Sequence, residues 1–392
     1  MLRRYEIPLR LIPDVGFHGG PTRAELDLDT LVAHVGARGH VLPDSVRLHT
    51  VDGRPLAADY LPGWGGAPPV LVVDMPPGLA RPLRLEVAVA PSPLEGGEGV
   101  EVRPGRGELA IRIDRRPFAT YRFDTDRPEL PRPYFHPIVG PSGVPITQDG
   151  EYPGRREGHF HHTGLFIAHQ NFTDGNNWQI GPNFSRMRHR DFPNLQSGRR
   201  LGRFVERLDW LDRAGSAIAC EELRIVYVYA RPPTSRYLDF EIALRTLQRP
   251  ITFNATPYQL LAIRVPDEMV PRGEGGGAIV NSEGQRNQET SGQRARWIDL
   301  SGPLGGKIVG VALFDAPTNF RHPTPCLNFE NETIGLAPTY HEPFTLPENR
   351  ELWLRYRVYL HEGNVETGKV AQEYRSYSVS VELQVGAPRP LP

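Results

Sequence analysis

Short stretches of alternating apolar and polar residues recur along most of this chain and constrain its fold more than any other feature. Between residues 222 and 229, one side of an extended strand would carry Leu223, Ile225, Tyr227 and Tyr229. Alternation with a period of two is typical of half-buried strands in antiparallel sheets. Similar stretches lie at residues 5–11, 45–51, 70–73, 83–89, 109–113, 118–123, 238–244, 260–265, 307–314, 352–360 and 377–385.

Glycine and proline divide these stretches from one another. The chain holds 40 of each. Proline lacks a backbone N–H and glycine tolerates positive φ, so both end regular structure. The intervals are too short for a helix between each pair of strands, which excludes a repeated βαβ fold. Helices are expected only at Ala24–Gly36 and Asn364–Ser376, and the sequence therefore predicts an all-β protein.

The length of 392 residues favours two domains. Residues 91–99, rich in proline and glycine, are the clearest linker. We predict a smaller β-rich accessory domain at residues 1–95 and a large antiparallel unit at residues 100–392. A unit of that size must stack or close its sheets, because one open sheet would leave long edges and a bare face.

Composition excludes several classes of partner. The net charge of −1 gives no electrostatic basis for binding nucleic acid or an anionic membrane. No stretch approaches the roughly 20 apolar residues of a membrane span, and no signal-peptide-like run follows the basic start. We therefore expect a cytoplasmic protein. Cys220 and Cys326 are too few for a disulfide framework, although one bridge stays open.

A group of histidines is the strongest chemical signal. His159, His161, His162 and His169 lie within eleven positions, and imidazole suits proton transfer or metal ligation because its pKa is near neutrality. On an extended strand over residues 160–169, His159 and His161 would share a face ~6.6 Å apart, with His169 roughly 26 Å further along. A three-histidine metal site within this segment is therefore not expected. The alternative is that some of these histidines are hydrogen-bonded core or surface residues.

Further candidates lie in other segments. Glu283 follows a glycine-rich loop and is either a general acid or base or a solvated carboxylate. Arg294 and Arg296 could hold a carboxylate or neutralise an enolate. Trp297 could stack on a sugar ring or pack in the core. His322 is a candidate acid, because Asp315 and Asn319 are near it in sequence.

Residues from about 107 to 361 resemble bacterial proteins of unknown function labelled "methane oxygenase PmoA-like". The matching segments are Arg132–Pro137, Gly140–Gly143, His161–Phe166, Asn281–Gly284, Arg294–Gly302, Phe314–Asn319 and Arg321–Thr324. The resemblance implies a β-supersandwich of the galactose-mutarotase type, a fold also used by polysaccharide lyases, and it implies carbohydrate chemistry.

The leading hypothesis is a carbohydrate lyase that acts by β-elimination on a small saccharide, uronate or oxidised glycoside. His161 or His162 would be the base, Glu283 or His322 the acid, and Arg294 or Arg296 would neutralise the enolate. The sugar would be positioned by His136, His169, Asn171, Asn177, Trp297 and His341. No bound cofactor is expected, and homo-oligomers stay open.

Four alternatives remain. A glycoside hydrolase would pair Glu283 with Asp299, Glu330 or Glu342, ~5–9.5 Å apart. A mutarotase or epimerase would use the same histidines without cleaving a bond. A metal-dependent enzyme would take ligands from His159, His161, His322 and His341. A non-catalytic carbohydrate-binding protein would stack sugars on Trp178, Trp297 and Trp353.

Overall fold

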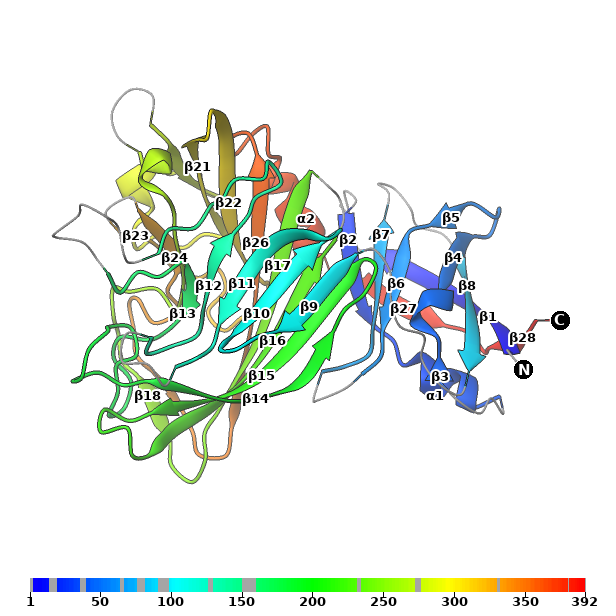
Figure 1. Ribbon diagram of the computed structural model, residues 1–392, viewed down its shortest axis with the longest axis horizontal. Coiled ribbons are helices and arrows are strands. Elements are labelled where there is room, and N and C mark those ends of the chain that lie inside the picture. Colours follow the sequence, from blue (N-terminus) through cyan, green and yellow to red (C-terminus); the bar gives the residue numbers. More distant parts are fainter. Residues whose placement is uncertain are drawn as a thin grey trace.

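The chain is all-β, as predicted (Figure 1). A computed structural model describes residues 3–13, 20–35, 40–63, 67–75, 82–90, 99–125, 130–149, 160–230, 234–271, 276–329, 332–379 and 381–391. Every strand pair in this part of the chain is antiparallel. The described ranges hold two α-helices, α1 (Leu28–Ala33) and α2 (Val370–Ser378), and three single-turn 3₁₀ helices at Pro43–Ser45, Asp267–Met269 and Asn287–Thr290.

Two eight-stranded sheets form the larger part of the molecule. In order across the first, which we call the long-stranded sheet, lie β14 (Met187–Gln196), β15 (Leu201–Leu211), β16 (Ile218–Tyr229), β17 (Ser235–Arg245), β26 (Glu351–Glu362), β22 (Lys307–Asp315), β21 (Trp297–Leu304) and β20 (Ala278–Asn281). In order across the second, the short-stranded sheet, lie β23 (Cys326–Phe329), β24 (Thr333–Leu336), β19 (Leu261–Arg264), β13 (Leu165–Ile167), β12 (Tyr134–Ile138), β11 (Arg116–Arg122), β10 (Glu108–Ile113) and β9 (Val100–Pro104).

The two sheets face each other across one hydrophobic core. Leu109, Phe135 and Ile263 contribute from the short-stranded sheet, and Phe204 and Val226 from the long-stranded sheet. Alternate residues of each strand point inward, which is the arrangement that period-two sequences favour. A separate two-stranded ribbon joins β18 (Ile251–Phe253) to β25 (Phe344–Leu346).

The N-terminal residues build two smaller sheets, which we call the N-terminal unit. The three-stranded sheet contains β2 (Gly20–Glu25), β7 (Val70–Met75) and β6 (Ala58–Leu61). The seven-stranded sheet contains β1 (Arg3–Pro13), β3 (His40–Val41), β4 (Arg47–Thr50), β5 (Pro55–Leu56), β8 (Pro82–Ala90), β27 (Val381–Val385) and β28 (Arg389–Pro390). The last two strands come from the far end of the chain and pair with β1, so both described ends lie together (Figure 1).

The N-terminal unit and α2 pack on the outer face of the long-stranded sheet. Val70 and Val72 of β7 join a cluster with Tyr227, Phe314 and, from α2, Tyr374. The central strands of this sheet are therefore apolar on both faces, as covered sheets require. This explains why the second half of the stretch at residues 222–229, from Ile225 onward, carries apolar side chains at every position.

Three expectations about local structure were wrong. The helix expected at Ala24–Gly36 begins only at Leu28, because β2 runs through Glu25 and the Asp27 side chain caps the helix by accepting from Thr30 N at 3.0 Å. The late helix expected at Asn364–Ser376 begins at Val370 and extends to Ser378, so the following strand begins at Val381 rather than Tyr377. Of residues 160–169, only Leu165–Ile167 form a strand.

The cysteines and the helices limit two further possibilities. Cys220 and Cys326 are both buried and free, so the bridge left open by the sequence does not form. In the part of the chain that the structure describes, neither helix has the length and apolar character that a membrane crossing requires.

Candidate functional site

Polar and aromatic side chains gather on the outer face of the short-stranded sheet. Neighbouring strands align His136, Gly164, Arg264, Thr333 and Phe329 in one row across it: Arg264 pairs with Thr333, Thr333 with Phe329, and Arg264 N donates to Gly164 O at 2.8 Å. Gly164 has a φ of +54°, and a Cβ there would lie 2.0 Å from the Phe135 carbonyl oxygen and 3.1 Å from the Cβ of His136. Only glycine fits this position, because the backbone of the neighbouring strand packs directly against it.

His162 lies directly above this row. Its Nδ1 atom is 3.2 Å from Glu332 Oε1 and 3.3 Å from Thr333 Oγ1, while Glu332 Oε2 is 3.4 Å from Arg264 Nη2. All three ionisable side chains are buried. A carboxylate beside one ring nitrogen fixes the orientation of an imidazole. We call His162, Glu332, Arg264, Arg132 and His161 the His162 cluster.

His161 is the partly exposed member of this cluster. It lies in the turn before β13, and its ring meets the His162 ring edge-on at a centroid distance of 4.4 Å. The sequence predicted an extended strand here, in which His161 and His162 would point to opposite faces. The structure has a turn instead, so that expected separation does not apply. His159 lies outside the described residues.

Arg132 supports the turn from below. Its Nη1 atom donates to the carbonyls of Asn177 (3.0 Å) and Trp178 (2.6 Å), its Nη2 atom donates to the carbonyl of His161, and its guanidinium lies 4.1 Å from the Phe166 ring centroid. The side chain is only 1% exposed. Burial lowers the pKa of Arg132 to about 9, which still leaves a cation at neutral pH. No carboxylate is among its partners in the described ranges, so this buried charge is balanced by carbonyl dipoles and an aromatic face.

Sequence reasoning did not propose Arg132, Arg264 or Glu332 as site residues. A usable signal existed for Arg264, because it interrupts an apolar strand that is buried on both faces. Arg132 had a weaker signal, its place between Pro131 and Pro133. Nothing near Glu332 in the sequence marks it as the partner of a histidine 170 positions earlier.

His136 occupies the next strand on the same face. Its Nδ1 atom is 3.0 Å from Thr147 Oγ1, and its carbonyl accepts from Arg122 Nε at 3.2 Å. Burial lowers the pKa of His136, against an opposing effect of the Asp149 carboxylate. Its imidazole is therefore neutral at physiological pH, which suits a hydrogen-bonding role toward a ligand.

His169 and Asn177 are buried beneath this face. Asn177 Oδ1 accepts from His169 N at 2.7 Å, His169 Nε2 is 2.8 Å from Thr339 Oγ1, and Asn171 N donates to His169 Nδ1 at 3.1 Å. Burial lowers the pKa of His169 to about 3. The geometry makes both residues supports for the loop that carries them. Asn171 is exposed and accepts from Asn254 Nδ2 at 3.1 Å.

The other predicted residues form a second group near the start of β23. Glu283 and Arg296 are about half exposed and 3.5 Å apart. Arg294 Nη1 donates to the carbonyls of Arg321 (2.9 Å) and Pro323 (3.0 Å). Two histidines complete the group: His322 Nδ1 lies 2.8 Å from Asp315 Oδ2, and His341 Nε2 lies 3.0 Å from Gly292 O.

The two groups contact opposite ends of β23. Arg294 forms a backbone bridge with Pro325, whereas His162 packs on Phe329 with ring centroids 5.4 Å apart. Four residues of extended chain span ~13 Å. The structure therefore brings His161 and His162 together on the face that His136 shares, and holds Glu283, Arg294, Arg296, His322 and His341 apart from these two histidines.

A family model matches residues 108–375 and is described as "Family of unknown function (DUF6807)". The chain belongs to this family. The match contains both groups of candidate residues and leaves out the strands that begin the N-terminal unit. None of the curated proteins matches the chain.

Solved structures with a similar fold include an alpha-mannosidase from Enterococcus faecalis V583, with a TM-score of 0.50 and 10% identity over 97% of this chain and 46% of that chain. A protein in glycosyl hydrolase family 38 from Enterococcus faecalis matches with a TM-score of 0.47 and 10% identity, over 97% of this chain and 47% of that chain. This family member thus spans about half the length of those two proteins. At 10% identity, the likeness to the alpha-mannosidase shows only a shared fold. Because the match covers 97% of this chain, that shared fold includes the N-terminal unit.

The tryptophans and carboxylates limit the alternatives. Trp178 is buried in the aromatic cluster with Phe166, and Trp297 is only 7% exposed, so neither offers a ring face for stacking a sugar. Asp299 is buried against His361 at 2.8 Å, and Glu330 lies outside the described residues. Within the described ranges, no three His, Cys, Asp or Glu side chains are grouped to hold a metal ion.

Proposed function

We propose that this protein is a carbohydrate-active enzyme whose site is the outer face of the short-stranded sheet at the His162 cluster. One observation carries the proposal: a partly exposed histidine, His161, stands on a buried chain of His162, Glu332 and Arg264. Active sites commonly gather buried, paired ionisable groups, because burial and neighbouring charge adjust proton affinity.

The proposed reaction is β-elimination from a uronate or oxidised glycoside. His161 removes the proton next to the carbonyl, a C=C bond forms, and the C–O bond to the leaving group breaks. When the proton and the leaving group lie on one face of the sugar, the protonated His161 returns its proton to the departing oxygen. His162 and its partner Glu332 orient the His161 ring, Arg132 holds the turn that carries it, and His136 binds a hydroxyl. General acid–base catalysis of this kind supplies ~10²–10⁴-fold.

Hydrolysis by two carboxylates is the second candidate, and the cluster supports it less well. Glu332, the carboxylate beside the histidines, is buried and shared by His162 and Arg264. It is thus placed to orient an imidazole rather than to attack a sugar. The proposal retains a small saccharide substrate, no bound cofactor and a cytoplasmic location as expectations.

The test is product analysis with a panel of uronate oligosaccharides and oxidised glycosides. Elimination produces an unsaturated sugar that absorbs in the ultraviolet, hydrolysis produces a new reducing end without that absorbance, and epimerisation changes configuration only. His161→Ala should abolish turnover while His34→Ala, at an exposed histidine of the N-terminal unit, should not. Unchanged turnover in His161→Ala would contradict the assignment.

A further inference from the structure

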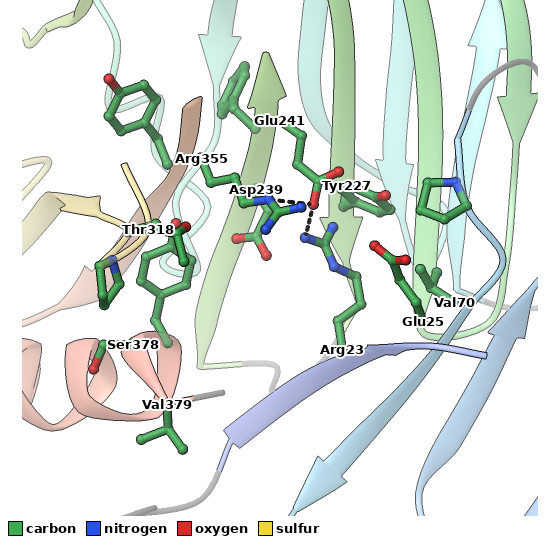
Figure 2. A pocket seen from close by; sticks show the side chains of 16 residues that line it. Arg23, Glu25, Val70, Tyr227, Asp239, Glu241, Thr318, Arg355, Ser378 and Val379 are labelled. Carbon is green, nitrogen blue, oxygen red and sulfur yellow. Dashed lines mark hydrogen bonds and ion pairs between the residues drawn. The ribbon is translucent and has the colours of Figure 1, made fainter. Parts of the chain in front are cut away.

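A cavity of about 330 Å³ lies between the N-terminal unit and the outer face of the long-stranded sheet (Figure 2). Arg23 and Glu25 of β2 line one side, and Glu241 and Asp239 of β17 line the other; Arg355 and Thr318 are also in its wall. The volume falls at the lower end of the ~300–1,000 Å³ range of small-molecule pockets. The whole sandwich separates this cavity from the His162 cluster, which is on the opposite outer face.

The centre of the cavity wall is a carboxylate shared by two guanidinium groups. Glu241 Oε1 is 2.6 Å from Arg23 Nη2 and 3.5 Å from Arg355 Nε, and Figure 2 shows both arginines directed at it. Arg23 also lies 3.7 Å over the Tyr227 ring. These contacts fix Arg23 and Glu241 in place, so the polar wall is preorganised rather than assembled on binding.

Two polar groups of the wall have no hydrogen-bond partner among the described residues. Nη1 of Arg23 and the hydroxyl of Tyr377 are buried and unpaired, and both residues line the cavity. An unpaired buried polar group costs ~1–3 kcal/mol. A ligand that supplies partners to these groups would therefore bind with a gain that an apolar ligand could not match.

The balance of charge identifies the class of ligand. Two guanidiniums, Arg23 and Arg355, face three carboxylates, Glu25, Asp239 and Glu241, and Asp239 is already paired with Arg357 at 2.6 Å. An anion would meet carboxylates, and a simple cation would meet arginines. Hydroxyl groups suit both kinds of charged group in the wall, because each hydroxyl can donate to a carboxylate and accept from a guanidinium.

We propose that this cavity binds a neutral polyhydroxyl ligand of monosaccharide size. The site is independent of the proposed reaction and joins the N-terminal unit to the sandwich through the ligand. Binding would contact β2 on one side and β17 on the other, so an occupied cavity would also hold the two parts of the molecule together.

The test is equilibrium binding to the full chain, by calorimetry or saturation-transfer NMR. The probes are D-glucose, D-galactose, D-mannose and myo-inositol, with D-glucuronate and inorganic phosphate as anionic comparisons. We expect at least one neutral probe to bind. Glu241→Gln should weaken its affinity at least about tenfold. Thr318→Trp should abolish binding, because the new side chain fills the cavity from its exposed rim. Thr345→Trp, at an exposed threonine of β25 that does not line the cavity, is the matched control.

Three outcomes would overturn the proposal. They are no binding of any neutral probe, binding of the anions alone, and neutral binding that both cavity variants leave unchanged. Binding that is lost in His161→Ala but kept in Thr318→Trp would assign the ligand to the His162 cluster instead. Thr318→Trp leaves the ion pairs of the wall intact, so its effect can be separated from a loss of folding by comparing melting temperatures with the Thr345→Trp control.

Discussion

The Nδ1 atom of His162 lies 3.2 Å from Oε1 of Glu332, although 170 residues separate them in sequence. The same carboxylate also neutralises Arg264, whose side chain is buried. Glu332 therefore holds a cation and an imidazole in one low-dielectric environment, where a missing partner is costly.

Replacing Glu332 tests this pairing directly. Glu332→Gln keeps the shape of the side chain but removes its charge, and we expect the free energy of unfolding to fall by about 2–4 kcal/mol because Arg264 loses its counter-ion. Denaturant unfolding measures the change. Glu342→Gln is the control, since Glu342 is 72% exposed, and it should stay within ~0.5 kcal/mol of the parent. Equal stability of the two variants would contradict the pairing.

Arg132→Met should destabilise the turn that carries His161. The substitution leaves the carbonyls of Asn177, Trp178 and His161 without their donor, at ~1–3 kcal/mol for each group that stays buried. Arg132→Lys should recover only part of the loss, because an ammonium cannot reproduce the planar fork. The free energy of unfolding, measured in urea, and the turnover rate should both fall in Arg132→Met. A stable Arg132→Met variant with full turnover would exclude the role.

His169 predicts a specific dependence of stability on pH. Its folded pKa of about 3 is below the ~6.5 of an unfolded histidine, so unfolding takes up a proton between those values. The contribution of neutral His169 to the free energy of unfolding is fully present above pH ~6.5. It declines as the pH falls toward 3, by at most ~1.4 kcal/mol per pH unit. His169→Gln should flatten the curve in this window. His34→Gln, at an exposed site, should leave the slope unchanged, and equal slopes in both variants would refute the prediction.

A buried ionic network in the sandwich core gives a fourth prediction. Arg224 Nε donates to Glu222 Oε1 at 2.7 Å and its Nη1 to the Tyr121 hydroxyl at 2.8 Å. Arg224→Met leaves Glu222 buried without a cation, so we expect a loss of ~3–5 kcal/mol in unfolding free energy. Arg207→Met removes a half-exposed ion pair with Asp191 and should cost ~1 kcal/mol or less. Calorimetry distinguishes the two, and similar costs would contradict a buried charged network.

The strands were predictable from sequence because most of them carry an unambiguous period. Expected stretches such as residues 238–244 and 307–314 fall within β17 and β22. The helix starting at Leu28 was misplaced because Leu26 and Leu28 fit both a strand and a helix, and only the Asp27 cap marks the true start. Local composition does not show where the two-residue period of a strand ends and the ~3.6-residue period of a helix begins.

The candidate site was predictable only in part. The two histidines were evident as a cluster, but Glu332 and Arg264 come from distant strands that antiparallel register brings alongside. Trp297 could not be assigned from alternation alone, because the long-stranded sheet is covered on both faces and its outward residues are also buried. Which face of a strand meets solvent depends on what later packs against it.

The pairing of β1 with β27 gives the protein an unusual order of assembly on the ribosome. Leu9 pairs with Val385, 376 positions later (385 − 9), so β1 waits for that length of chain to be synthesised before its outer edge is covered. At ~5–20 residues per second, that interval lasts tens of seconds. During it, β1 presents unpaired backbone groups of the kind that recruit other nascent chains. Its exposure during synthesis makes this edge a natural point for chaperone capture.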